Sequence, residues 1–212
     1  YFMCLLPIKK NNMNRSVYLI LAFLLSTLVF AQKTITLSNL YDGTFRPNAP
    51  QQIHSQQDGS HYTVLEHSLL RRGSTIVQYS YETLKQTATL FNSANWAEIS
   101  QIYSYEFSEN EQKILLETNT VPIFRYSKKA RYFIYDIATK ELLSLSPNLV
   151  QEPMFSPDAT KVAYVLDRDI YVLDLNTNQT KRITFDGNDH ISNGLTDWVY
   201  EEEFKFCLLY TS

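Results

Sequence analysis

Residues 155–164 read FSPDATKVAY, and they are the most informative stretch for the fold because a matching segment occurs earlier in the sequence. Residues 107–116, FSENEQKILL, align with them at an offset of 48 (155 minus 107). In both copies polar residues typical of a turn precede a run that favours a β-strand. A structural repeat is therefore expected, with Phe107 and Phe155 at equivalent positions.

A second pair of matching segments follows each of these copies. Residues 172–177, VLDLNT, align with residues 134–139, IYDIAT, at an offset of 38 (172 minus 134). Residues 79–83, YSYET, are a weaker third copy. A strand-rich repeat of about 40–50 residues is typical of β-propeller blades. The alternative is a β-sandwich in which the similarity arose by chance, and the repeat favours the propeller.

The two offsets differ by ten residues (48 minus 38), which predicts an insert in the earlier blade. We place the insert at residues 118–130, where a loop between two strands is expected. Loops on a rigid scaffold often carry binding residues. Asp136 and Asp174 occupy equivalent repeat positions, so we expect them to stabilise turns and not to act in catalysis.

The first part of the chain has the pattern of an export signal. Residues 13–32 combine a basic start, an apolar run and a small residue near the exit, which predicts a signal peptide cleaved near Ala31 or Gln32. The apolar run is shorter than the roughly 20 residues of a membrane span. An uncleaved membrane anchor is the alternative interpretation.

The two ends of the chain are interpreted separately from its fold. Residues 1–12, upstream of Met13, are expected to be translated flanking sequence, and residues 205–212 a non-native tail. Residues 33–204 would then form the N-terminal β-propeller domain, in part. Both cysteines, Cys4 and Cys207, lie outside that range, so no disulfide is expected within it.

Composition and motifs argue against several classes of function for this chain. The net charge is −3 and no basic stripe is present, which argues against a nucleic-acid partner. The sequence contains no G-x-S-x-G, CxxC, HExxH or P-loop motif. The four histidines do not form a credible ligand set, so neither a metal nor a cofactor is predicted; they are His54, His61, His67 and His190.

Residues 197–204, DWVYEEEF, place three carboxylates side by side at Glu201, Glu202 and Glu203. Like charges this close repel one another, so the cluster needs solvent or a cation. A free α-amino group, largely charged near neutral pH, is one such cation. A solvated acidic turn is the alternative interpretation of the same residues.

The octapeptide and the repeats together resemble the dipeptidyl peptidase IV family, strongly from residue 131 onward. In that family a Glu pair within the propeller grips the N-terminal amine of the substrate. The resemblance places this pair at Glu202 and Glu203, with Glu201 the less engaged neighbour. It also matches Arg125, in residues 124–127 (FRYS), to an arginine that helps to hold a substrate carbonyl. A surface arginine on a hairpin tip is the alternative for Arg125.

The predicted fold class is all-β, a partial β-propeller of N-terminal blades preceded by a signal peptide. The resemblance implies that a C-terminal α/β-hydrolase domain carrying a Ser-Asp-His triad lies beyond this segment. The segment alone would then be inactive, with no catalytic residue of its own.

The resemblance implies a secreted serine exopeptidase that releases dipeptides after Pro or Ala from peptides with a free N-terminus. No nucleic acid or cofactor is implied, and a homodimer of the full-length protein is left open. The expected location is the periplasm or cell surface of a Gram-negative bacterium. The alternatives are a non-catalytic periplasmic propeller and a prolyl peptidase with endo- or tripeptidyl specificity.

Overall fold

The computed structural model describes residues 35–42, 44–45, 52–68 and 73–204. The chain divides into two units, residues 1–49 and 50–212. In its described part the first unit carries one short helix, α2 (Leu37–Tyr41), whose start is capped by the Thr36 side chain. The expected flanking sequence, signal peptide and C-terminal tail lie outside the described residues.

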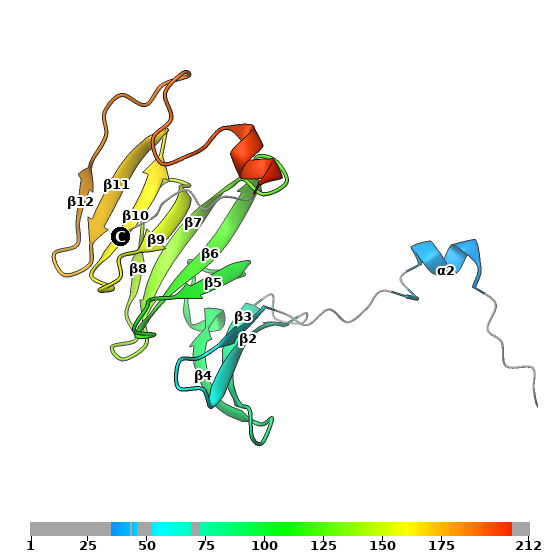
Figure 1. The fold of residues 1–212 in the computed structure, drawn as a ribbon. Helices are drawn as coiled ribbons and strands as arrows, with labels where there is room; N and C mark the ends of the chain where they lie inside the picture. Colours follow the sequence, from blue (N-terminus) through cyan, green and yellow to red (C-terminus); the bar gives the residue numbers. More distant parts are fainter. Residues whose placement is uncertain (1–34, 43, 46–51, 69–72, 205–212) are drawn as a thin grey trace, which may run out of the picture. The chain divides into compact units, whose positions relative to one another are not determined.

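The second unit contains three four-stranded antiparallel sheets, each with its strands paired in chain order (Figure 1). The first sheet comprises β1 (Ile53–Ser55), β2 (His61–Ser68), β3 (Gly73–Ser80) and β4 (Gln86–Asn92). The second comprises β5 (Ser104–Phe107), β6 (Lys113–Pro122), β7 (Lys128–Asp136) and β8 (Leu142–Ser144). The third comprises β9 (Gln151–Phe155), β10 (Lys161–Leu166), β11 (Asp169–Asp174) and β12 (Gln179–Arg182). Repeated four-stranded sheets of this kind are the blades of a propeller, so the predicted all-β, propeller-blade architecture is confirmed for the described residues, while the signal peptide stays a prediction.

The turn between the first two strands is built in the same way in the second and third sheets. The Ser108 amide donates to the Lys113 carbonyl at 2.9 Å, and the Ser156 amide donates to the Lys161 carbonyl at 2.9 Å. Each serine hydroxyl accepts a hydrogen bond from the amide of the same lysine, at 3.0 and 2.9 Å. The repeat seen in the sequence is therefore a repeated turn between equivalent strands.

The second repeated turn joins the third and fourth strands of each sheet. One carboxylate oxygen of Asp136 accepts from the amides two and three residues later, at 3.0 and 2.9 Å. Asp174 repeats this arrangement at 3.0 and 3.0 Å. In the first sheet the Ser80 hydroxyl accepts from the amide three residues later at 3.4 Å, a weaker version of the same turn. Both aspartates thus stabilise turns, as predicted.

The expected insert at residues 118–130 forms mainly strand and only a short loop. Val121 pairs with Lys129 and Pro122 pairs with Lys128, after a register shift that follows Thr118. The extra residues therefore lengthen β6 and β7 and leave only residues 123–127 as the hairpin tip. Only part of the insert is the expected loop, because an offset between repeats counts residues without showing whether they pair.

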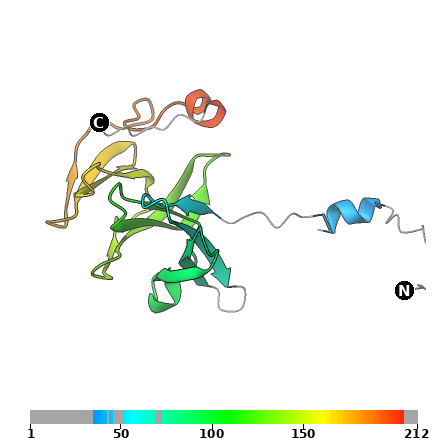
Figure 2. The same cartoon turned by 60° about the horizontal axis from the view of Figure 1, so that its bottom comes forward.

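The second sheet is buried on both faces, since it packs against the first sheet on one side and the third on the other (Figure 2). Successive side chains of a strand point to opposite faces. On β7, Phe133 and Tyr135 join the cluster shared with the first sheet, whereas Tyr132 and Ile134 join the cluster shared with the third. The alternation along β7 thus holds three sheets together.

Replacing Phe133 by alanine should weaken the contact between the first two sheets. Phe133 is 1% exposed, and removal of a buried phenylalanine side chain typically costs about 3–5 kcal/mol. Urea unfolding should show this loss as a lower free energy of unfolding. Phe185→Ala, at a position 73% exposed, is the control and should stay within about 0.5 kcal/mol of the unchanged protein. A loss below about 1 kcal/mol for Phe133→Ala would contradict the packing.

His54 on β1 should make the stability depend on pH. Its ring lies 4.4 Å from the Tyr105 ring between centroids, and no described residue hydrogen-bonds its buried Nε2. Burial lowers the pKa of His54 below its ordinary value of 6.5. The unfolded chain then binds more protons, so the free energy of unfolding should fall as the pH drops below about 6.5. Urea midpoints from pH 7.5 to 5 measure this, and His54→Phe should flatten the slope; an unchanged slope would contradict it.

Candidate functional site

The acidic run forms η3 (Val199–Glu203), a single turn of π-helix. The Phe204 amide donates to the Val199 carbonyl at 3.3 Å, which is the wider spacing of that helix type. Asp197 begins the turn, because its carboxylate accepts from the amides of Val199 and Tyr200 at 2.9 and 3.2 Å. The Asp of the motif therefore shapes the segment that presents the three glutamates.

The three adjacent glutamates lie in different environments. Glu202 is 3% exposed, Glu201 is half-buried and Glu203 is exposed. One turn of helix rotates neighbouring side chains away from one another, so the run does not present a single acidic face. The three carboxylates therefore have different capacities to bind a ligand.

The Glu202 carboxylate is held by the tip of the β6–β7 hairpin, which lies beside η3 in Figure 1. Its Oε1 accepts from the amide and the hydroxyl of Ser127 at 2.8 and 2.7 Å. The Tyr126 amide reaches Oε1 at 3.1 Å and Oε2 at 3.0 Å. These contacts join segments 75 residues apart in the chain.

The hydrogen bonds also determine the charge of Glu202. Burial by itself would raise the pKa of this carboxyl, but donors from Ser127, Tyr126 and the backbone of Arg125 together bring it below its ordinary value of 4.5. Hydrogen bonds to the charged form favour ionisation. Glu202 is therefore a buried carboxylate that is negatively charged at neutral pH.

Glu201 lines a cavity of about 580 Å³ beside the hairpin tip. Its Oε1 is buried, and no described residue hydrogen-bonds it. Burial raises the pKa of Glu201, and the negative charges of Glu152 and Glu202 raise it further. Phe124 and Arg168 also line this cavity, which thus has apolar, acidic and basic walls.

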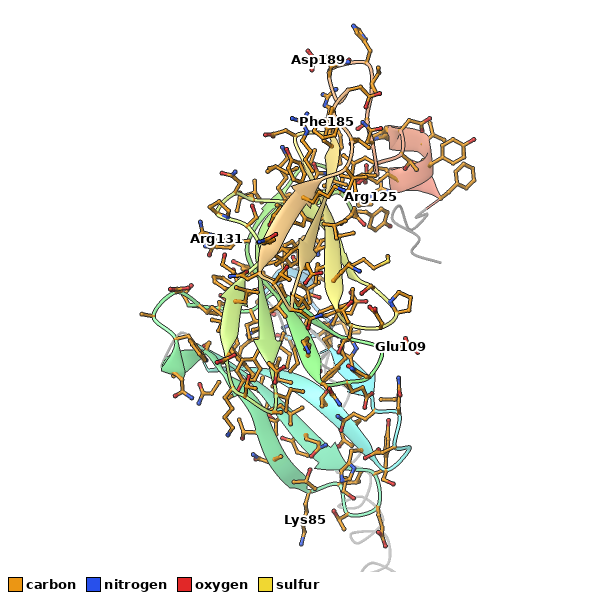
Figure 3. All side chains as sticks on the ribbon, turned by 90° about the vertical axis from the view of Figure 1, so that its left-hand side faces the viewer. Lys85, Glu109, Arg125, Arg131, Phe185 and Asp189 are labelled. Atoms are coloured by element: carbon orange, nitrogen blue, oxygen red, sulfur yellow. The ribbon has the colours of Figure 1, made fainter. Side chains whose placement is uncertain are left out.

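Arg125 lies at the exposed tip of the same hairpin, at the end of the sheets that carries η3 (Figure 3). Its guanidinium carbon is 5.8 Å from the centre of the Tyr126 ring, a cation–π arrangement. The structure therefore brings the hairpin of Arg125 together with Glu202, while Glu203 stays exposed on η3.

Asp169 is a residue of this region that sequence reasoning missed. Its carboxylate is 2% exposed and accepts from Arg182, from the Thr184 hydroxyl at 2.7 Å and from the Gly187 amide at 3.1 Å. The Asn193 side chain adds a donor at 3.3 Å. A Cβ at Gly187 would lie 2.6 Å from a backbone oxygen, so only glycine fits there. Asp169 thus anchors the segment leading to η3. No sequence pattern links Asp169 to Gly187, because the two residues lie 18 positions apart in the chain.

Within the described ranges, no group of three or more His, Cys, Asp or Glu side chains could hold a metal ion. No helix in the described part of the chain is long and apolar enough to cross a membrane.

Residues 108–208 match the family model of the dipeptidyl peptidase IV (DPP IV) N-terminal region. Dipeptidyl peptidase 4 of Felis catus is 33% identical over 177 residues, which are 82% of this chain and 22% of the relative. Prolyl endopeptidase FAP of Homo sapiens is 31% identical over 176 residues, 81% of this chain and 22% of that protein. The chain therefore spans 22% of the length of these two relatives.

A solved structure agrees with these sequence matches. The crystal structure of Porphyromonas gingivalis dipeptidyl peptidase 4 superposes with a TM-score of 0.73 at 34% identity. The match covers 84% of this chain and 26% of that one. The family match spans β6 to β12, the hairpin tip and η3. The chain belongs to the dipeptidyl peptidase IV family, and its three sheets are blades of that family's N-terminal propeller region.

Proposed function

We propose that the whole protein is a serine exopeptidase that releases dipeptides from peptide N-termini, and that this segment binds the α-amine of the substrate. One observation carries the proposal: Glu202 is buried and ionised, and its carboxylate is bonded to the hairpin that bears Arg125. The relatives that share the segment are peptidases by name, which supports a peptidase over a non-catalytic propeller.

The acidic run would fix the distance between the bound amine of the substrate and its scissile bond. Carboxylates at Glu202 and Glu203 would pair with the positive amine, while Arg125 would hold a carbonyl of the substrate. A blocked N-terminus carries no charge to pair with, and a longer one would place its amine beyond the carboxylates. Holding the substrate at both points would orient the scissile bond, and such orientation can contribute strongly to the rate.

The competing specificity is that of an endopeptidase. Family membership does not decide between the two, since one relative is named a dipeptidyl peptidase and the other a prolyl endopeptidase. The carboxylates of η3 favour recognition of a free amine. A preference for cleavage after Pro or Ala is proposed from the same resemblance. A gene that encodes no Ser-containing elbow downstream of this segment would favour a binding propeller instead.

Removing a carboxylate from the whole protein should weaken cleavage of substrates with a free amine. Glu202→Gln and Glu203→Gln each remove one charge-assisted contact, worth roughly 1.5–3 kcal/mol. The expected loss in kcat/KM is about ten- to a hundredfold for dipeptidyl chromogenic substrates. Arg125→Ala should lose less, because it would contact a carbonyl and not the amine.

N-acetylated substrates and the exposed Glu98→Gln variant are the controls for this prediction. The unchanged enzyme should reject acetylated substrates, and the two Glu variants should lose most of that discrimination. Glu98→Gln should behave like the unchanged enzyme. Full free-amine activity in both Glu202→Gln and Glu203→Gln would show that the acidic run is only a solvated turn.

We further propose that the protein is exported to the periplasm or cell surface of a Gram-negative bacterium. The pattern of residues 13–32 supports this, since it combines a basic start with an apolar run. Expression with the natural leader should yield an exported protein whose first residue lies near Ala31 or Gln32. N-terminal sequencing measures this, and an exported protein that begins at Met13 would indicate a retained anchor.

A further inference from the structure

The two oxygens of the Glu202 carboxylate are not equally occupied. Oε1 accepts three hydrogen bonds, from the Tyr126 amide and from the amide and hydroxyl of Ser127. The Tyr126 amide is shared between the two oxygens, because it also lies 3.0 Å from Oε2. The backbone of Arg125 is a further donor to this carboxylate. A carboxylate oxygen has about two lone-pair directions, so Oε1, which already accepts three hydrogen bonds, is saturated by the protein. A ligand cation that pairs with Glu202 must therefore approach Oε2.

We infer that Ser127 is a positioning residue for amine recognition: its hydroxyl fixes Oε1 of Glu202 and thereby turns Oε2 toward a ligand ammonium. This inference rests on the proposed function, because it concerns the same carboxylate. The Ser127 side chain is itself buried, at 3% exposed, and its hydroxyl lies 2.7 Å from Oε1. Ser127 would touch no substrate atom and would act through Glu202 alone.

The hydroxyl can be removed without removing the contacts that close the hairpin. The Ser127 carbonyl accepts from the amides of Ile123 and Phe124 at 2.9 and 3.2 Å. Lys128 binds Glu117 at 2.6 Å, directly beside the tip. These contacts use the backbone of Ser127 or other side chains, so a Ser127→Ala protein is expected to keep the tip and lose the fixed orientation of the carboxylate.

The test uses the whole protein and a dipeptidyl chromogenic substrate with a free amine. Ser127→Ala should lower kcat/KM about tenfold, the typical effect of losing one hydrogen bond to a charged group. Ser127→Thr keeps the hydroxyl and should restore most of the activity. Ser108→Ala removes another buried serine hydroxyl of the same sheet, one that serves a turn, and should leave kcat/KM unchanged.

The pH profile separates positioning from a general loss of structure. The Ser127 hydroxyl helps to lower the pKa of Glu202, so its loss should move the acid limb of kcat/KM to higher pH. The pKa of Glu201 is raised by burial and by the charges of Glu152 and Glu202. Glu201 is present in every variant, so it contributes to all of the pH profiles that are compared. An acid limb that stays in place in Ser127→Ala would overturn the inference.

A double-mutant cycle with Glu202→Gln tests whether Ser127 acts through that residue. In the Glu202→Gln protein, adding Ser127→Ala should change kcat/KM less than twofold. A full further tenfold loss would show that Ser127 acts elsewhere and would overturn the inference. If Glu202→Gln itself leaves free-amine cleavage unchanged, the proposed function fails. If Glu202→Gln is impaired while Ser127→Ala equals the unchanged enzyme, the inference alone fails.

A second variant keeps the test decisive if Ser127→Ala loses its cooperative thermal transition. Ser127→Cys nearly preserves the side-chain volume and offers only a weak S–H donor. At an unchanged Tm its kcat/KM should fall toward the tenfold loss expected for alanine. Activity equal to that of the unchanged enzyme would overturn the positioning role of Ser127.

Discussion

The buried carboxylate of Glu202 is the constraint on which the candidate site depends. An ionised carboxylate withdrawn from water is costly unless donors replace the lost hydration. Here the donors lie at the tip of the β6–β7 hairpin and are the amides of Tyr126 and Ser127, the Ser127 hydroxyl and the backbone of Arg125. They can reach η3 because β6 and β7 extend past the register shift that follows Thr118. The longer hairpin and the acidic run thus form one structural unit.

The second sheet sets a different constraint on the fold. Its two faces are covered by the first and third sheets, and β7 contributes alternate side chains to both clusters. A four-stranded sheet with two apolar faces cannot be stable by itself in water, because both faces must be covered. The hairpin that carries Arg125 therefore extends from the sheet that is packed on both faces. That support allows a short tip to hold a defined position at the edge of a cavity.

The repeats could be predicted from sequence because each turn requires particular residues at fixed spacing. Ser108 and Ser156 serve one turn and Asp136 and Asp174 the other, and both contacts are local. The different environments of the three glutamates could not be predicted. Three identical adjacent residues carry no periodicity, and the donors that bury Glu202 lie 75 residues away. The role of Asp169 is hidden for the same reason, since its partners follow at sequence distances of 13 to 24 residues.

Glu202 and Glu203 differ in burial, so they would contribute differently to the proposed binding of the substrate amine. An exposed carboxylate such as Glu203 attracts a cation, but water and salt screen that attraction and its side chain must be ordered on binding. Glu202 is ordered before the ligand arrives, because donors from the hairpin tip already fix its carboxylate. An anion held in place in this way loses little further conformational freedom when an ammonium binds. Recognition of a charged amine over a blocked one would then use both carboxylates in different ways: Glu202 would supply the charge that is fixed in advance, and Glu203 would supply attraction from the solvent side.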